Sequence, residues 1–141
     1  MRRPPRRASR AQQATGLGTA APADEKALRA QSALVDARAV EPVLLDMRGL
    51  TFITDYFLIC HGTSNVHIRG LADAVTEALE ERGLRPNGVE GYREARWILL
   101  DYGDFIIHIF AEEERQFYTL ERLWSDAPRI PSLAPGEPPD V

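Results

Sequence analysis

The sequence predicts an α+β fold, in which a mixed β-sheet of about five strands carries packed helices. Two short apolar runs, 97–100 and 105–110, flank a break at 101–104 that holds Gly and Asp, and this arrangement is typical of a β-hairpin. Residues 65–82 repeat apolar side chains at the helical period, which indicates an amphipathic helix. Because both faces of the hairpin are mostly apolar, we expect it to lie centrally with both sides covered.

The first third of the chain is predicted to hold one helix followed by two strands. Residues 24–40 carry a modest apolar face and begin with two acids, which suit the positive end of a helix dipole. Pro42 should end this helix, because proline disfavours helical geometry at the residue before it. Residues 43–47 and 54–60 are short and rich in apolar or aromatic side chains, so both are expected to be strands.

The amphipathic helix has sequence signals at both of its ends. Residues 61–63 form the preceding turn, Ser64 is a favoured N-cap residue, and Gly83 lies where a helix C-terminal glycine is expected. Residues 88–90 follow as a predicted short strand in a segment rich in Gly and Pro. The hairpin comes next along the chain.

The last predicted helix begins at Glu112, where three successive acids fill its first turn. Pro128 and Pro131 should end it. Its predicted apolar stripe consists of Phe117, Leu120, Leu123 and Trp124. The predicted order is therefore helix, strand, strand, helix, short strand, hairpin and helix.

Composition divides the chain into a basic leader at 1–23, a folded domain at 24–127 and a Pro-rich tail at 128–141. The leader holds five Arg and no acid, a formal charge of +5, and it has too little apolar surface to fold, so we predict disorder. The other 12 basic residues and all 21 acidic residues lie in 24–141, which therefore carries −9. The tail holds five Pro and is also predicted to be disordered.

The leader leaves two further interpretations open, an organelle transit peptide and a basic arm that touches RNA electrostatically. Pro4 and Pro5 make a transit peptide the weaker interpretation, because they would interrupt the amphipathic helix that such a peptide forms. The chain has 16 Arg but one Lys, which suggests a high-GC genome. We therefore predict a bacterial, cytoplasmic protein, with an organelle as the alternative.

Several classes of partner and cofactor are not expected. The acidic domain is a poor match for direct, sequence-specific nucleic acid binding, and a basic protein surface is the more natural partner. No apolar run is long enough to span a bilayer, so no membrane contact is predicted. Cys60 is the only cysteine, and His61, His67 and His108 lack metal-site spacing on one helix, so no metal and no cofactor are predicted.

The sequence lacks a recognisable catalytic pattern, so a protein that is not an enzyme is predicted. A nucleotidyltransferase needs two neighbouring carboxylates on a strand to hold Mg²⁺, and no D-x-D or D-x-E pair occurs in a predicted strand. The turn at Thr63 and Ser64 precedes a helix, where phosphate can bind backbone amides, but no P-loop motif follows. A nucleotidyltransferase-like, nucleotide-binding enzyme that uses this turn stays as the alternative.

Trp97 is the residue that most suggests partner binding. It is either a core residue or a partly exposed anchor, because Trp and Tyr are enriched at interface hot spots. Asp101 and Tyr102 supply polar groups near the hairpin turn. Glu112 would add negative charge if the start of its helix lies near the same face.

Three groups of motifs occur in a fixed order along residues 24–127. They are TDYF at 54–57 with HGTSNVH at 61–67; GVEG at 88–91 with WILLDYGD at 97–104 and His108 in the next strand; and FYTLERLW at 117–124. Each piece is a weak signal alone, but the ordered set is specific. Together they resemble the ribosomal silencing factor family, also called the Iojap family.

The resemblance implies a translation repressor that is not an enzyme. Members of this family bind the large ribosomal subunit through its ribosomal protein fourteen and sterically block joining of the small subunit, chiefly when nutrients are short. Their fold is similar to the nucleotidyltransferase superfamily without its catalytic carboxylates, and some members form homodimers. By resemblance, the partner surface centres on Trp97, with Asp101 and Tyr102 as neighbours and Glu112 as a weaker candidate.

Overall fold

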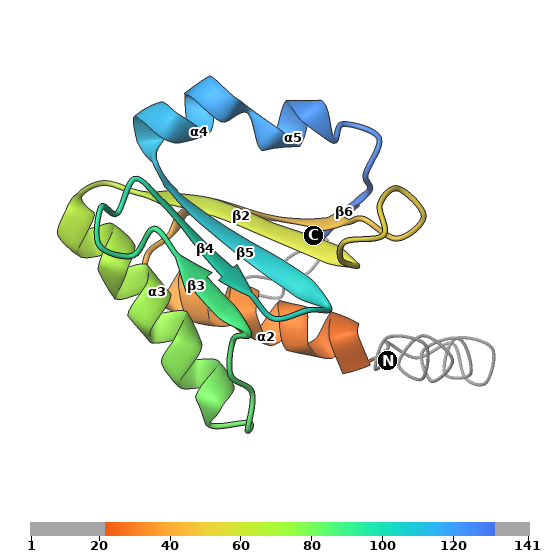
Figure 1. Ribbon diagram of the computed structural model, residues 1–141, viewed down its shortest axis with the longest axis horizontal. Helices are drawn as coiled ribbons and strands as arrows, with labels where there is room; N and C mark the ends of the chain where they lie inside the picture. Colours follow the sequence, from red (N-terminus) through yellow and green to blue (C-terminus); the bar gives the residue numbers. More distant parts are fainter. Residues whose placement is uncertain (1–21, 132–141) are drawn as a thin grey trace.

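The structure is a computed structural model that describes residues 22–131 (Figure 1). The predicted disorder of residues 1–21 and 132–141 therefore lies outside the described residues, whereas residues 22 and 23, which were also assigned to the leader, begin a helix. The elements, in chain order, are α2 (Pro22–Asp36), β1 (Val40–Asp46), β2 (Tyr56–Gly62), α3 (Asn65–Glu80), β3 (Gly88–Glu90), β4 (Trp97–Asp101), β5 (Phe105–Ala111), α4 (Glu112–Tyr118), α5 (Leu120–Leu123) and β6 (Arg129–Ile130). Across residues 22–131, no helix is long and apolar enough to cross a membrane.

The strands form one mixed sheet in the order β3-β4-β5-β2-β1-β6. Only β2 and β5 pair in parallel, and the other neighbouring strands are antiparallel. The predicted hairpin is confirmed as β4 and β5, and β5 lies inside the sheet with every residue buried. The predicted α+β fold is also confirmed, with one strand more than expected because β6 pairs with β1.

Helices cover both faces of the sheet, as Figure 1 shows. Helices α2 and α3 cover one face, where a large core is built around Leu34, Tyr56 and Leu71. Helices α4 and α5 lie over the other face, where a smaller core contains Phe57 and Phe110. Because side chains alternate along a strand, successive residues of β4 and β5 contribute to the two cores in turn.

The signals at the ends of α3 are confirmed. The Ser64 hydroxyl oxygen accepts a hydrogen bond from the His67 backbone N–H at 3.0 Å, as an N-cap side chain does. Gly83 adopts φ +78° just after the helix, a conformation that glycine takes without steric cost. The predicted end of this helix at residue 82 is two residues later than the observed end at Glu80.

The boundary between α2 and β1 differs from the prediction. The helix ends at Asp36 and the strand already begins at Val40, so Pro42 lies within β1 and does not end a helix. A β-bulge between Val40 and Val43 accommodates this, with Glu41 at φ +49°. Proline is tolerated at such a place because the bulge interrupts the ladder of hydrogen bonds.

The C-terminal helix also differs from the prediction. It breaks at Thr119, which adopts a left-handed conformation with φ 44° and ψ 55°, and so forms two short helices, α4 and α5. Two members of the predicted apolar stripe, Phe117 and Leu123, are exposed, whereas Leu120 and Trp124 pack against the smaller core. The predicted Pro-rich tail contributes β6 through Arg129 and Ile130 before the described chain ends.

Candidate functional site

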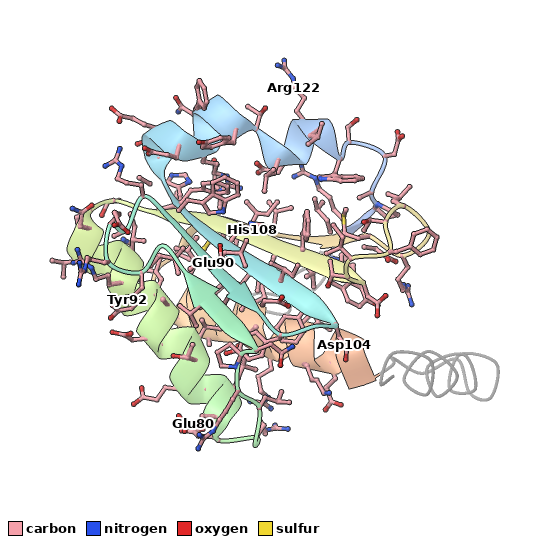
Figure 2. All side chains as sticks on the ribbon, in the orientation of Figure 1. Glu80, Glu90, Tyr92, Asp104, His108 and Arg122 are labelled. Carbon is pink, nitrogen blue, oxygen red and sulfur yellow. The ribbon has the colours of Figure 1, made fainter. Side chains whose placement is uncertain are left out.

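A cluster of aromatic side chains occupies the face of the sheet that α4 and α5 cover. The Trp97 ring lies 4.9 Å from the Phe110 ring and 4.7 Å from the Tyr118 ring, measured between centroids. His108 lies beneath them on β5, with its ring 4.6 Å from that of Phe57 in an edge-to-face arrangement. Such contacts stabilise ring pairs beyond the effect of burial alone. Figure 2 shows His108 on the side of the sheet turned toward α4 and α5.

The indole N–H of Trp97 is bonded inside the protein. It donates to Nδ1 of His108 at 3.1 Å, which requires the neutral tautomer of His108 with its proton on Nε2. His108 is 4% exposed, and burial lowers the pKa of its imidazole to about 4, so the ring is neutral at pH 7. The hydrogen bond is therefore intact at physiological pH.

Part of this cluster faces solvent. Trp97 and Leu99 are half-buried, Tyr118 is 44% exposed and Phe117 is 78% exposed. We call these four residues the Trp97 patch. The ring centroids of Phe117 and Tyr118 are 5.0 Å apart, so the aromatic surface continues from β4 onto α4. An exposed cluster of large apolar side chains is characteristic of an interaction surface.

Acidic side chains surround the Trp97 patch. Glu90 on β3 is the cross-strand partner of Leu99 and is exposed, and Asp101 lies on the same face farther along β4 (Figure 2 labels Glu90). Arg96 pairs with Glu113 and Glu114 at the start of α4. This one arginine faces two carboxylates, so the rim of the patch carries net negative charge.

The structure does not bring the four sequence-predicted residues together. Trp97 lies in the patch, and Asp101 lies on the same face near the hairpin turn, where its carboxylate accepts from the Gly103 N–H at 2.8 Å. Tyr102 packs against the large core on the opposite side of the sheet, and burial raises the pKa of its phenol to about 12. Glu112 lines cavities beside His61 and Thr63 and does not lie in the aromatic cluster.

Sequence reasoning did not assign Phe117 and Tyr118 to this surface, or His108 to the buried layer beneath it. Phe117 was assigned to the apolar stripe of the last helix, but in α4 it faces solvent. The FY pair at the start of the third motif group was the available signal. His108 was named only among the three histidines and as part of the second motif group, although a histidine inside an otherwise apolar strand needs a partner for its polar side chain.

Gly91 sets the path of the chain into Trp97. It adopts φ +78°, and a Cβ atom at this position would lie 2.1 Å from the Trp97 carbonyl oxygen. No other residue type fits without moving the backbone of β4. Glycine at position 91 therefore allows the loop between β3 and β4 to lie this close to the start of β4.

Arg115 fixes α4 to the sheet. Its guanidinium donates to the carbonyls of Val40 and Glu41 at 3.0 and 2.8 Å, and these carbonyls lie in the bulge of β1. It also contacts His61 Nδ1 at 2.9 Å and pairs with the carboxylate of Glu121 on α5. Burial and the Arg115 charge lower the pKa of His61, so the imidazole is a neutral acceptor. One side chain thus connects two strands and two helices.

A cavity of about 460 Å³ adjoins Arg115, and it is lined by Glu41, Glu121 and Arg122 among others. The N–H groups of Arg115 beside this cavity already donate to the Val40 and Glu41 carbonyls and to Glu121. Burial alone would raise the pKa of Glu121, but the hydrogen bonds and charge of Arg115 outweigh it and leave that pKa lowered. This network is structural, and it supports the position of α4 and Tyr118 over Trp97.

The turn at Thr63 and Ser64 uses its polar groups internally. The Thr63 N–H donates to Nδ1 of His67 at 3.0 Å, and Nε2 of His67 lies 3.2 Å from the Ala37 carbonyl. Ser64 caps α3. The Thr63 amide, which phosphate binding at this turn would use, is therefore already engaged. Within residues 22–131, no group of three or more His, Cys, Asp or Glu side chains could hold a metal ion.

Comparisons with known proteins agree on one family. The family model described as "Ribosomal silencing factor during starvation" matches residues 20–140. The chain is similar to the ribosomal silencing factor RsfS of Bacillus subtilis, with 43% identity over 99 residues that span 70% of this chain and 84% of that protein.

Two crystal structures share the fold. One is of a Bacillus halodurans protein, with TM-score 0.67, 37% identity, and coverage of 76% of this chain and 97% of that one. The other is of a Chromobacterium violaceum protein, with TM-score 0.70, 28% identity, and coverage of 84% and 92% respectively. On the family match and the sequence identity together, the chain belongs to the ribosomal silencing factor family.

Proposed function

We propose that this protein represses translation by binding the large ribosomal subunit through ribosomal protein fourteen, so that the small subunit cannot join. Family membership supports a ribosome-associated silencing role. The observation that carries the proposal is the Trp97 patch, where aromatic side chains from β4 and α4 contact one another and are partly open to solvent. The role needs no turnover, because a bound protein of this size can obstruct an interface by its volume alone.

Charge supports a basic protein as the partner. Residues 24–141 carry −9, and acidic side chains border the Trp97 patch. An apolar centre with an acidic rim fits a basic protein surface, and it repels the phosphates of bare RNA. We therefore place the primary contact on a ribosomal protein, in the cytoplasm of a bacterium, with no cofactor and no membrane.

Within this proposal, Trp97 is the anchor of the interface. Its ring is fixed by Phe110, Tyr118 and His108, so little conformational freedom is lost when a partner covers it. Asp101 contributes from the same face as part of the acidic rim. Tyr102 and Glu112 were expected to contribute too, but their positions make them weaker candidates than Phe117 and Tyr118.

Co-sedimentation with separately purified large and small ribosomal subunits tests the proposal. We expect the wild-type protein to bind the large subunit alone, and Trp97→Ala to weaken this binding by about 2 kcal/mol or more, as hot-spot truncations do. Phe52→Ala is the matched control, because Phe52 is an aromatic side chain that is 93% exposed in the loop between β1 and β2. Equal loss of binding in both variants, or none in Trp97→Ala, would remove the patch from the interface.

Two alternatives have their own readouts. A nucleotide-binding enzyme that uses Thr63 and Ser64 would show a higher melting temperature with nucleotide and Mg²⁺, and the function proposed here predicts no shift. A homodimer would be detected by light scattering across concentrations. If the dimer covers the Trp97 patch, cross-linked dimers should not bind the large subunit.

A further inference from the structure

His108 occupies a position where an apolar side chain would be the simpler choice. It lies in β5 between Ile107 and Ile109, which are both fully buried, and it is itself 4% exposed. Its Nε2 atom carries the proton and has no hydrogen-bond partner among the described residues. A buried donor without a partner costs free energy relative to an apolar side chain of similar size. The contact at Nδ1 is therefore the feature of this imidazole that an apolar residue could not replace.

The Nδ1 contact reaches diagonally across the hairpin. In the register of β4 and β5, His108 is opposite Leu99 and Trp97 is opposite Phe110. The indole nevertheless extends to His108 and donates its N–H there at 3.1 Å, with the two ring centroids 5.9 Å apart. The hydrogen bond favours the rotamer of Trp97 that directs the indole N–H toward His108.

The same bond determines what Trp97 can offer to a partner. Its only polar group is the indole N–H, and that group is already used within the protein. The partner therefore meets the ring surface, which binds apolar groups or a cationic side chain over the ring face. A basic protein surface supplies the cationic side chain.

We propose that His108 positions Trp97 for partner binding, by accepting the indole N–H at Nδ1 and fixing the ring in the orientation that the partner meets. This inference rests on the function proposed above. His108 does not itself touch the partner, because it is buried beneath the cluster. It acts through the tryptophan.

Two substitutions separate the hydrogen bond from simple packing. His108→Leu removes the acceptor, whereas His108→Asn keeps an acceptor oxygen bonded to Cγ, where Nδ1 is bonded in histidine. Ile107→Val is the control for a small loss of core packing, because Ile107 is the adjacent buried residue of β5 and belongs to the core on the opposite face. Circular dichroism would confirm that each variant is folded.

Two readouts are required. The first is the affinity of each variant for purified large ribosomal subunits. The second is the indole ¹H–¹⁵N resonance of Trp97, with that of Trp124, the other tryptophan, as an internal reference. We expect His108→Leu to bind about tenfold more weakly and to shift the Trp97 resonance. We expect His108→Asn to restore both to near the wild-type values, and Ile107→Val to change neither.

The outcomes distinguish this inference from the proposed function. If the wild-type protein binds and His108→Leu binds equally well, the positioning role is wrong while the proposed function stands. If His108→Asn is as weak as His108→Leu, the acceptor is not what matters and the role is also wrong. If the wild-type protein binds no large subunit, the proposed function is wrong and this inference falls with it.

Discussion

His108 and Arg115 are polar side chains buried on the same face of the sheet, but their bonding differs. Arg115 uses its guanidinium on two carbonyls, one imidazole and one carboxylate. His108 uses one ring nitrogen and leaves the other without a partner among the described residues. Arg115 therefore stabilises the fold, whereas His108 costs some stability in its place beneath the half-buried Trp97.

The buried imidazole of His108 should make stability depend on pH. Its pKa is about 4 in the folded protein against 6.5 when unfolded, so the unfolded chain binds the additional proton between these values. The stability that depends on a neutral His108 is therefore fully present above pH 6.5 and is lost as the pH falls toward 4. Between pH 7 and 4.5, the free energy of unfolding should fall by about 2 kcal/mol more in the wild-type protein than in His108→Leu.

Urea unfolding of both proteins at the two pH values measures this difference. The carboxylates and His61 titrate in both proteins, so their contributions cancel in the comparison. An equal fall in stability for wild type and His108→Leu would show that His108 is not buried as a neutral imidazole.

Arg115 is the side chain that holds α4 and α5 in place on the sheet. Arg115→Met should lower the free energy of unfolding by about 3 kcal/mol, because it leaves the Glu121 carboxylate and two bulge carbonyls without their partner. Arg122→Met is the control, since Arg122 is exposed on α5 and points away from the sheet in Figure 2. Its effect should stay within about 0.5 kcal/mol. Chemical denaturation that gave equal effects would contradict the bonding described for Arg115.

A substitution in the loop before β4 tests the close approach of Gly91 to the Trp97 backbone. Gly91→Ala should lower the free energy of unfolding by about 2 kcal/mol or more, because the new Cβ would meet the Trp97 carbonyl at 2.1 Å in a left-handed conformation. Gly70→Ala, within α3 and with open space around its Cβ, should instead stabilise the protein by about 1 kcal/mol. Thermal unfolding of the two variants checks the opposite signs; a stable Gly91→Ala protein would refute the close approach.

Elements with strong local signals could be predicted, and elements fixed by distant contacts could not. The apolar period of α3, the Ser64 cap and the runs of β4 and β5 are local properties of the sequence. The bulge at Val40–Val43 is held by Arg115, which precedes the break at Thr119 and lies more than seventy residues away in sequence. Strand β6 has two residues beside a proline, too few for a periodic signal, and exists because β1 offers it an edge.

The candidate site was predictable only in part for a related reason. Trp97 was proposed because tryptophan is common at interfaces, but its neighbours in sequence were assumed to be its neighbours in space. Tyr102 packs against the opposite face of the sheet, and Asp101 lies near the hairpin turn, at the other end of β4. Tyr118, which contacts Trp97, and Phe117, which contacts Tyr118, come from α4, and only the fold brings them to this surface.

Across the whole molecule, the two faces of the sheet have different roles. The face under α2 and α3 is closed by a large core, and it supplies most of the burial. The face under α4 and α5 is only partly covered, which leaves the Trp97 patch exposed with acids around it. A domain with an apolar, negatively bordered surface of this kind is suited to docking on a basic protein.

A subunit-joining experiment tests the central claim most directly. Purified small and large ribosomal subunits are mixed with equimolar wild-type protein or Trp97→Ala, and joined ribosomes are measured by light scattering and gradient sedimentation. We predict that the wild-type protein lowers the joined fraction and that Trp97→Ala, folded but weakly bound, does not. If the wild-type protein sediments with the large subunit while ribosomes still join to the same extent, the claim that it represses translation by blocking joining is contradicted.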